Sequence, residues 1–389
     1  MKRISSAAIL AAAITAVAPA AAEDTIKIGA AVGLSGWIVP YDQPALRGVE
    51  MAIADINAAG GVLGRQLELV LSDTKADQAQ AARSAIELLD GGAEMLIASC
   101  DYDFGGPAAS EANDRGVVAF SLCAGDHKFG VSGIGPFAYT MTTTAAVEGY
   151  AAAEWAASKG WGKAYVLLDD TIQYTKTLCG AFEENAGKVD GLDVAGKDTF
   201  KNGDPSISTQ ITRLQGMSPQ PDFIYLCSYA PGAITAIRQL RSAGVDLPIL
   251  TSGAMDGDSW KDSVANLKDF YYDTWASMYG GNADPRLDKF FVDYKAKYGE
   301  EATTSLAIFG YAAIEIWAKA AEKAGTLEGD KVRQTLDGMA DEPTLGGLTT
   351  FTDKIHYGMI GRDLVMMEIQ DWKRTVLGPF RPKNLPQLD

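Results

Sequence analysis

Apolar runs alternate with amphipathic stretches along most of this chain, beginning with the segment from Ile26 to Asp73. It opens with the run IKIGAAVGLSG (26–36) and closes with LELVLSD (67–73), and the residues between them repeat at helical spacing. A strand, a crossover helix and a second strand predict a parallel βαβ unit. Ligands of such sheets bind beyond the carboxyl ends of the strands, so the turn from Leu34 to Tyr41 is a candidate binding rim.

A helix near residues 43–59 connects these two strands. Asp42 is placed to cap its N-terminus, Pro44 suits its first turn, and Gly60-Gly61 provides a left-handed stop. The apolar positions of the helix recur on one face, and they are Leu46, Val49, Ile53 and Ile56.

The same alternation continues to residue 121 and predicts a doubly wound α/β domain. Its strands are expected near 25–32, 67–72, 94–99 and 117–121, with helices near 43–59, 76–90 and 105–114. A second α/β set follows an extended crossing segment at 135–143. We expect its strands near 163–168, 192–199, 222–227, 247–251 and 269–275, and its helices near 144–159, 173–187, 206–216 and 231–243.

Three further helices are predicted near 285–298, 302–323 and 328–338. Because no strands separate them, they cannot form a third α/β domain, and we expect them to complete the first one. Strands return from Leu348 onward, including the run at 363–372.

The N-terminal stretch has the features of a secretory signal. Lys2 and Arg3 precede an uncharged apolar run at 4–22, which ends in three alanines before two acidic residues. We interpret residues 1–22 as a signal peptide that is cut after Ala22, so that the mature chain is exported. The alternative is a membrane anchor, but the run is rich in alanine and barely long enough to span a bilayer.

Charge narrows the range of partners. Without the two basic residues of the signal, 32 basic and 50 acidic residues remain, which is a net charge of −18. Such a surface repels nucleic acid and anionic lipid and favours solubility. The remaining length, about 367 residues, exceeds what one hydrophobic core supports, so two domains are expected.

The four cysteines show no metal-type spacing, and no structural metal is expected. Cys100 and Cys123 follow two predicted strands, and they can form a disulfide if those strands are neighbours. Cys179 and Cys227 are a second candidate pair. Buried free thiols are the alternative, and the sequence does not decide between the two states.

Motifs of the common enzyme classes are missing from the sequence. It contains no nucleophile elbow, P-loop or zinc-protease motif, and His127 and His356 are its two histidines. The GxGxxA match at 133–138 contains a proline and does not join a strand to a helix, so we interpret it as a loop. We therefore expect no catalytic residue, no cofactor and no bound metal.

Aromatic and acidic residues gather in the loops that follow predicted strands. Aromatic walls with a few polar groups are typical of small-molecule pockets. The aromatic residues are Trp37, Tyr41, Tyr102, Phe104, Tyr174 and Tyr229. The acidic residues are Asp101, Asp103, Asp126, Asp169, Asp170 and Asp256. Aspartates at these positions either cap helices and turns or favour a cationic or hydroxyl-rich ligand.

The segments 26–75, 160–185 and 220–245 resemble the periplasmic solute-binding proteins that serve ABC importers of leucine, isoleucine, valine and related compounds. The resemblance is carried by IKIGAAVGLSG, AIADINAAGGVLGR, LLDDTIQYTKTL and DFIYLCSYAP. It implies two similar α/β lobes that are joined by three crossing segments and close on a ligand in the cleft between them. The implied lobes are 23–143 plus 279–350 (lobe 1) and 144–278 plus 351–389 (lobe 2).

The resemblance also assigns positions in the cleft. Tyr102 stands where the leucine/isoleucine/valine-binding protein has a carboxylate-binding serine. Ala124 lies in the loop that supplies a backbone carbonyl for the amine, although the binding threonine of that loop is missing here. Tyr174 and Tyr229 match tyrosines that face the ligand, and the acidic partner of the amine is absent unless Asp256 replaces it.

Relative to the family, the aromatic positions of the cleft are thus retained, whereas the polar groups that bind the carboxylate and amine of an α-amino acid are lost. We predict a monomeric periplasmic protein that captures a small polar or aromatic metabolite, such as an amino acid, aromatic acid, amide, polyol or amine, and delivers it to an ABC permease. A sensor that presents its solute to a membrane receptor or kinase is the alternative, and a secreted α/β enzyme is a third hypothesis. The predicted ligand contacts are Trp37, Tyr41, Tyr102, Asp103, Phe104, Ala124, Asp126, Tyr174, Tyr229 and Asp256.

Overall fold

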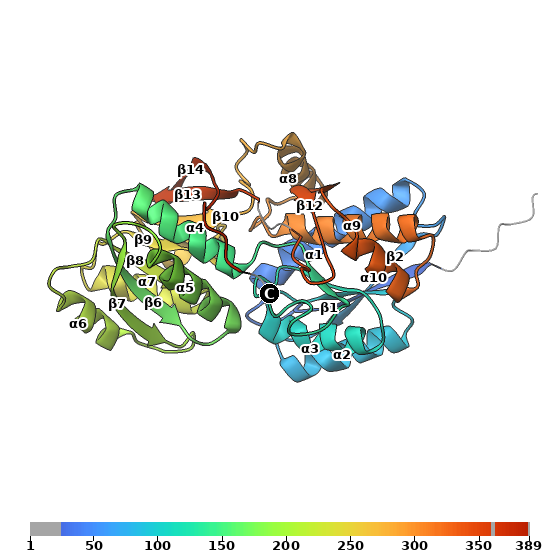
Figure 1. Ribbon diagram of the computed structural model, residues 1–389, viewed down its shortest axis with the longest axis horizontal. Coiled ribbons are helices and arrows are strands. Elements are labelled where there is room, and N and C mark those ends of the chain that lie inside the picture. Colours follow the sequence, from blue (N-terminus) through green and yellow to red (C-terminus); the bar gives the residue numbers. More distant parts are fainter. Residues whose placement is uncertain (1–24, 359–361, 388–389) are drawn as a thin grey trace, which may run out of the picture.

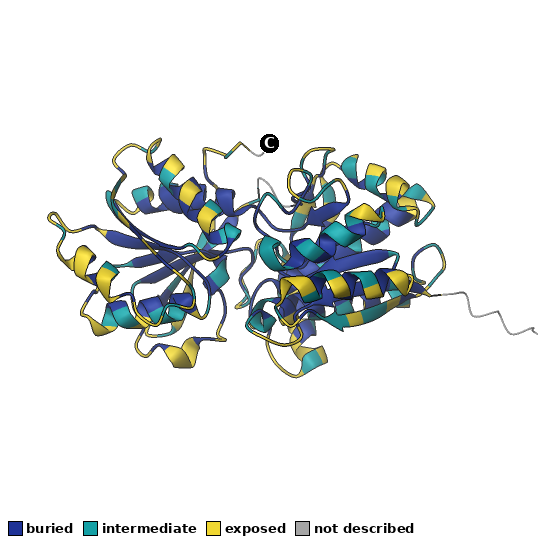
Figure 2. Cartoon of the chain, turned by 90° about the horizontal axis from the view of Figure 1, so that it is seen from below, coloured by how far each residue is buried: buried dark blue, intermediate teal, exposed yellow. Residues whose placement is uncertain are grey.

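The computed structural model describes residues 25–358 and 362–387, and it consists of two α/β lobes that lie side by side (Figure 1). The predicted signal peptide lies outside the described residues. In both lobes the central strands are buried between helices whose outward faces are exposed (Figure 2). Within the described part of the chain, no helix is long and apolar enough to cross a membrane.

The first sheet has five parallel strands in the order β2-β1-β3-β4-β5. They are β1 (Ile26–Val32), β2 (Leu67–Asp73), β3 (Met95–Ala98), β4 (Ala119–Ser121) and β5 (Ala138–Thr140). The helices between them are α1 (Val39–Ala58), α2 (Gln78–Asp90) and α3 (Tyr102–Asp114). The segment 135–143, which was predicted only to cross between the lobes, therefore also supplies the edge strand β5.

The second sheet is mixed, in the order β14-β13-β10-β9-β8-β6-β7. Its parallel strands are β6 (Lys163–Asp169), β7 (Asp193–Phe200), β8 (Phe223–Cys227), β9 (Ile249–Thr251) and β10 (Phe270–Thr274). The antiparallel strands β13 (Leu364–Gln370) and β14 (Lys373–Phe380) extend the sheet beyond β10. Its helices are α4 (Ala145–Ser158), α5 (Gln173–Ala186), α6 (Ser208–Gln215) and α7 (Gly232–Ser242). Because β7-β6-β8-β9-β10 repeats the order of the first sheet, the two lobes share one topology.

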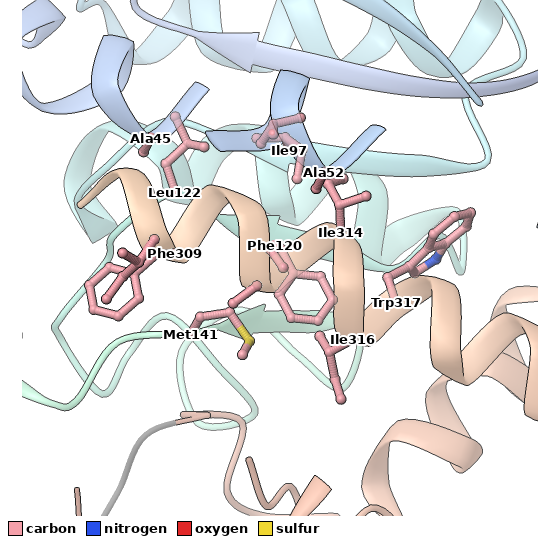
Figure 3. Packing of buried hydrophobic residues seen from close by; sticks show 14 of the residues in the cluster. Ala45, Ala52, Ile97, Phe120, Leu122, Met141, Phe309, Ile314, Ile316 and Trp317 are labelled. Carbon is pink, nitrogen blue, oxygen red and sulfur yellow. The ribbon is translucent and has the colours of Figure 1, made fainter. Parts of the chain in front are cut away.

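Helices α8 (Pro285–Tyr298), α9 (Ala307–Ala324) and α10 (Gly329–Asp337) contribute to the core of the first lobe. A short hairpin of β11 (Glu342–Thr344) and β12 (Gly347–Thr349) follows them. Helix α9 crosses α1 closely, because a Cβ on Gly48 would lie only 2.0 Å from the carbonyl oxygen of Ala307. Figure 3 shows the apolar core beside this crossing, with Ala45, Ala52, Ile97, Phe120, Leu122, Met141, Phe309, Ile314, Ile316 and Trp317.

The start of α1 differs from the prediction. The helix begins at Val39, and Asp42 is buried inside its first turn instead of capping it. The Asp42 carboxylate accepts hydrogen bonds from the backbone N–H groups of Gly33 and Cys100, each at 2.7 Å, and from the Ser99 hydroxyl at 2.5 Å. Burial raises the pKa of Asp42 to about 6 despite these bonds. The predicted cap is therefore wrong, since Asp42 ties the loop after β1 to the loop after β3.

The chain crosses between the lobes from β5 to α4, from β10 to α8 and from β12 to β13. At the junction Thr140 forms a parallel β-bridge with Tyr357 and donates its backbone N–H to the carbonyl oxygen of His356 at 3.0 Å. The indole N–H of Trp275 donates to the Thr143 hydroxyl at 2.8 Å. The crossing segments are therefore hydrogen-bonded to one another where the lobes meet.

Candidate functional site

The strand order reverses once in each sheet, and ligands of open α/β sheets bind beside such a reversal. In one lobe the reversal lies between β1 and β3, and in the other between β6 and β8. The loops that leave these strands, together with those after β4, β9 and β10 and the start of α9, line a cavity of about 60 Å³ between the lobes. The lining residues are Trp37, Ile38, Tyr41, Cys100, Asp101, Cys123, Gly125, Ile172, Tyr174, Tyr229, Gly253, Ala254, Trp275 and Leu306. Both lobes line this small cavity, so the lobes are closed around it.

Aromatic rings from the two lobes meet at the cavity. The ring of Trp37, which precedes α1, lies 5.1 Å from the ring of Tyr229, which follows β8. Trp37 also packs edge-to-face with Phe104, with ring centroids 5.1 Å apart. The Trp37–Tyr229 contact thus joins aromatic lining residues of the two lobes, and such a wall suits an apolar or aromatic solute.

Hydrogen bonds also cross between the lobes. The Tyr41 hydroxyl accepts from the backbone N–H of Ala230 at 3.0 Å and donates to the carbonyl oxygen of Ala254 at 3.2 Å. Burial raises the pKa of Tyr41, so this hydroxyl keeps its proton. Because both partners lie in the loops after β8 and β9, Tyr41 connects α1 directly to the opposite lobe.

Asp103 and Asp126, which were predicted to contact the ligand, also form hydrogen bonds between the two lobes. Asp103 accepts from the backbone N–H of Gln173, the first residue of α5, at 2.7 Å. Asp126 is buried and accepts a short hydrogen bond from the Thr177 hydroxyl, also on α5. Both carboxylates therefore bind α5 across the cleft, and neither lines the cavity.

Two glycines allow aromatic rings to reach the cavity wall. A Cβ on Gly125 would lie 3.0 Å from the Tyr174 ring, and one on Gly253 would lie 2.7 Å from the Trp275 ring. Neither glycine has a positive φ, so the requirement is for space rather than for backbone freedom. Any larger residue would displace these rings.

The structure contains two disulfides. Cys100 is joined to Cys123, and Cys179 is joined to Cys227. The first bond links the loops after β3 and β4, and both of its cysteines line the cavity. The second joins α5 to β8 inside the core of the other lobe. Only the first disulfide therefore shapes the cavity.

Asp101 is the acidic residue of the lining. It has a φ of +79°, and its carboxylate accepts from the backbone N–H of Asp103 at the start of α3. Burial and the neighbouring carboxylates of Asp103 and Asp126 raise the pKa of Asp101 well above its usual range. No lysine, arginine or histidine is among the described lining residues, so the cavity offers no cation to a carboxylate ligand.

Four of the ten predicted contacts line the cavity, namely Trp37, Tyr41, Tyr174 and Tyr229. Ala124 does not present a free carbonyl, because its oxygen accepts from the hydroxyls of Thr140 (3.0 Å) and Thr142 (2.8 Å). Tyr102 packs against an alanine-rich cluster that includes residues of α3, and the Phe104 ring contacts that of Trp37 without lining the cavity.

The carboxylate of Asp256 is also taken up by hydrogen bonds within the protein. It is buried, and its carboxylate accepts from the Ser305 backbone N–H and the Thr274 hydroxyl, each at 2.9 Å. It is absent from the cavity lining, so it does not stand in for the missing acidic partner there.

The sequence interpretation missed Trp275 and Leu306, which complete the lining from the crossing segment after β10 and from the start of α9. Trp275 is the last residue of the predicted strand at 269–275, whereas in the structure β10 ends at Thr274 and Trp275 follows it, so the rule applied to the other strands identifies Trp275 only once the strand end is known. Leu306 precedes a helix and carries no such signal. Its position depends on how α9 packs against the first lobe.

The chain resembles known proteins along most of its length. The profile of the Periplasmic binding protein family matches residues 25–373. The leucine-, isoleucine-, valine-, threonine- and alanine-binding protein of Pseudomonas aeruginosa is 26% identical over 335 residues, which cover 84% of this chain and 86% of that protein. The Leu/Ile/Val-binding protein of Escherichia coli is 28% identical over 228 residues, which cover 58% of this chain and 60% of that protein.

Solved structures share the fold. A branched-chain amino acid transporter substrate-binding protein of Streptococcus pneumoniae, solved with isoleucine, superimposes with a TM-score of 0.80 at 24% identity. That match covers 92% of this chain and all of the other. A solute-binding protein of Rhodopseudomonas palustris, in complex with benzoate, gives a TM-score of 0.77 at 16% identity over 92% of this chain and 97% of the other. These likenesses establish the two-lobed α/β architecture.

Proposed function

Because this chain belongs to the periplasmic binding protein family, we propose that it captures a small solute between its lobes and delivers it to the permease of an ABC importer. The observation that carries the proposal is the cavity itself, which is enclosed by aromatic residues of both lobes. A site of this kind binds by shape, by hydrogen bonds and by exclusion of water, and it requires no bond chemistry.

The lining supports a solute with an apolar or aromatic body. Trp37, Tyr174, Tyr229 and Trp275 are among the lining residues, and Asp101 is the one acidic residue in the described lining. A carboxylate solute would be buried beside acidic groups without a compensating cation, which is costly. We therefore place amines, amides and uncharged aromatic compounds ahead of α-amino acids among the candidate solutes.

The rest of the proposal follows from the family and the sequence. We infer that the signal at residues 1–22 directs the chain to the periplasm, with cleavage after Ala22. The protein then acts there as a monomer that docks on its permease in the closed form. We propose no catalytic role, and the curated relatives described above are named as binding proteins.

The test has two parts. The protein is first expressed with its own leader and examined by native mass spectrometry, because a closed cavity retains its solute during gentle purification. It is then unfolded and refolded, and thermal unfolding is measured with a panel of L-leucine, L-isoleucine, L-alanine, L-threonine, benzoate, acetamide, glycerol and benzylamine. Binding to the native state raises Tm by several degrees at concentrations well above Kd.

Matched variants locate the site. Tyr174→Ala removes part of the cavity wall and is expected to abolish most of the Tm shift. Tyr311→Ala is the control, because Tyr311 lies on α9 and its hydroxyl donates to Asp55 at 2.9 Å, away from the cavity. Equal loss of the shift in both variants, or retention in both, contradicts this placement of the site.

A further inference from the structure

Two buried acidic side chains meet behind the Tyr174 wall of the cavity. Glu148 lies in the first turn of α4 and Asp273 lies near the end of β10, and they are 0% and 2% exposed. Their carboxyl groups are within hydrogen-bonding reach of each other. The Tyr174 hydroxyl donates to Glu148 Oε2 at 3.0 Å, so the pair is connected directly to a residue of the cavity lining.

Each carboxyl has one oxygen without a hydrogen-bond donor. In the described residues these atoms are Glu148 Oε1 and Asp273 Oδ2. A buried oxygen that lacks a donor is costly, and two carboxylates side by side also repel each other. A single proton between the two groups removes both costs. The protonated oxygen donates a hydrogen bond to the oxygen of the other carboxyl, and one of the two negative charges is cancelled.

The surroundings favour that proton. The groups that face the pair are the Tyr174 hydroxyl from α5, the Tyr225 hydroxyl from β8 and the backbone N–H of Gly253 after β9, and all of them are uncharged. No lysine, arginine or histidine is among the described groups that act on either carboxyl. Burial is the main cause that raises the pKa of both carboxyl groups above their usual range, and the neighbouring Glu148 carboxylate raises that of Asp273 further.

We propose that Glu148 and Asp273 share one proton at neutral pH, that this proton fixes the Tyr174 wall of the cavity, and that its loss to solvent weakens solute binding. The last part rests on the proposed function. Both acidic residues act through Tyr174 and are therefore positioning residues, which the solute does not touch.

The direction of the effect follows from the geometry. When the proton leaves, two facing carboxylates repel each other, and Glu148 can no longer hold the Tyr174 hydroxyl in the same place. A solute that fills the cavity excludes the remaining water and makes the doubly charged pair still less favourable. Solute binding and proton retention therefore favour each other, and affinity falls as pH rises through neutrality.

The shared proton is tested without any solute. Infrared spectra of the ligand-free protein at pH 6, where exposed carboxyls are ionised, are expected to show the carbonyl stretch of a protonated carboxylic acid. Asp42 and Asp101, whose pKa values are also raised, contribute to this band, so the share of the pair is taken as the difference between the parent protein and each of Glu148→Gln and Asp273→Asn. We expect a clear difference at pH 6 and a smaller one at pH 8.5. Two variants are used so that one remains for the comparison if the other fails to fold. Absence of this difference at pH 6 in the folded variants overturns the proposal.

The link to the cavity is tested by affinity at pH 6 and pH 8 for the panel compound that gives the largest Tm shift. Linkage to one proton allows at most about a tenfold change per pH unit, and we expect a total loss of about threefold to tenfold. Glu148→Gln should remove this loss of affinity between pH 6 and pH 8. Any pH dependence of affinity that remains in this variant measures titration of the compound itself. An unchanged pH profile in Glu148→Gln overturns the proposal.

Tyr174→Phe separates the proton from its effect on binding. This variant is expected to keep the infrared band, because the carboxyl pair remains, but to lose the pH dependence of affinity, because the hydroxyl contact with Glu148 is gone. A Tyr174→Phe protein that keeps the full pH dependence contradicts the role of Tyr174. If no panel compound or retained solute binds while the band is present, the proposed function fails and the shared proton stands.

Discussion

Asp103 and Gln173 are hydrogen-bonded across the cleft: the carboxylate, on α3 of one lobe, accepts the backbone N–H of the residue that begins α5 in the other at 2.7 Å. An anion is favoured at a helix N-terminus because unpaired N–H groups and the helix dipole point toward it. This contact forms only when the lobes are closed. It therefore contributes to the stability of the closed form in addition to anything a solute contributes.

We expect Asp103→Ala to shift the ligand-free protein toward an open form. A hydrogen bond to a charged group contributes about 1.5–3 kcal/mol, which is enough to change the closed-to-open ratio at least tenfold. Small-angle scattering should report a larger radius of gyration for the variant. The control is Asp77→Ala, because Asp77 accepts from Gln80 N–H at the start of α2 within one lobe. Equal radii for Asp103→Ala and the parent protein would rule out a role in closure.

Tyr41→Phe should accelerate solute release. The substitution removes a hydroxyl that accepts from Ala230 and donates to Ala254 but leaves the ring in the cavity wall. Loss of two neutral hydrogen bonds, at about 1 kcal/mol each, predicts an affinity about tenfold or more below that of the parent protein, mainly through a faster dissociation rate. Stopped-flow measurement of dissociation tests this. Tyr311→Phe removes a hydroxyl bond within one lobe and should leave the rate unchanged.

Gly253→Ala should disturb the wall formed by Trp275. The added methyl group would lie 2.7 Å from the indole ring, so the ring or the backbone must move. Overpacking of this kind typically costs about 1–3 kcal/mol, and we expect lower solute affinity together with a shift of tryptophan fluorescence. Gly180→Ala on α5 is the control, because no atom lies within 4 Å of a Cβ there and alanine favours a helix. Similar fluorescence in Gly253→Ala and the parent protein would contradict the expected displacement.

The two disulfides should differ in their effect on binding. Removing either pair, as Cys100→Ala with Cys123→Ala or as Cys179→Ala with Cys227→Ala, is expected to lower the free energy of unfolding by about 2–4 kcal/mol. Chemical denaturation measures this loss. Only the first double variant should also lower solute affinity, because only its cysteines line the cavity. Equal affinity in both double variants would show that the first disulfide has no role in the site.

Most helices and strands could be predicted because their signals are local. The run at 26–32 and the helical face that includes Leu46 and Val49 are set by the residues themselves. The exceptions are short or depend on distant partners. Strand β5 has three residues and becomes a strand by pairing with β4, and α1 begins at Val39 because Asp42 is held by Gly33 and Cys100.

The candidate site was predictable only in part. The rule that ligands bind beyond strand ends identified Trp37, Tyr41, Tyr174 and Tyr229, all of which line the cavity. The same rule could not tell that Asp103 binds the opposite lobe, because the sequence does not state which loops face each other across the cleft.

By itself, the sequence determined the alternation of strands and helices, the acidic charge and the family to which the chain belongs. These follow from the periodicity of apolar residues, the amino-acid composition and the short sequence motifs, all of which are local properties of the chain. Only the tertiary structure decided which aspartates close the lobes, which disulfide borders the cavity, and that Glu148 meets Asp273 in the protein interior. The physical reason is that these contacts join segments far apart in the sequence, and their energies depend on burial and distance, which exist only once both sheets are packed.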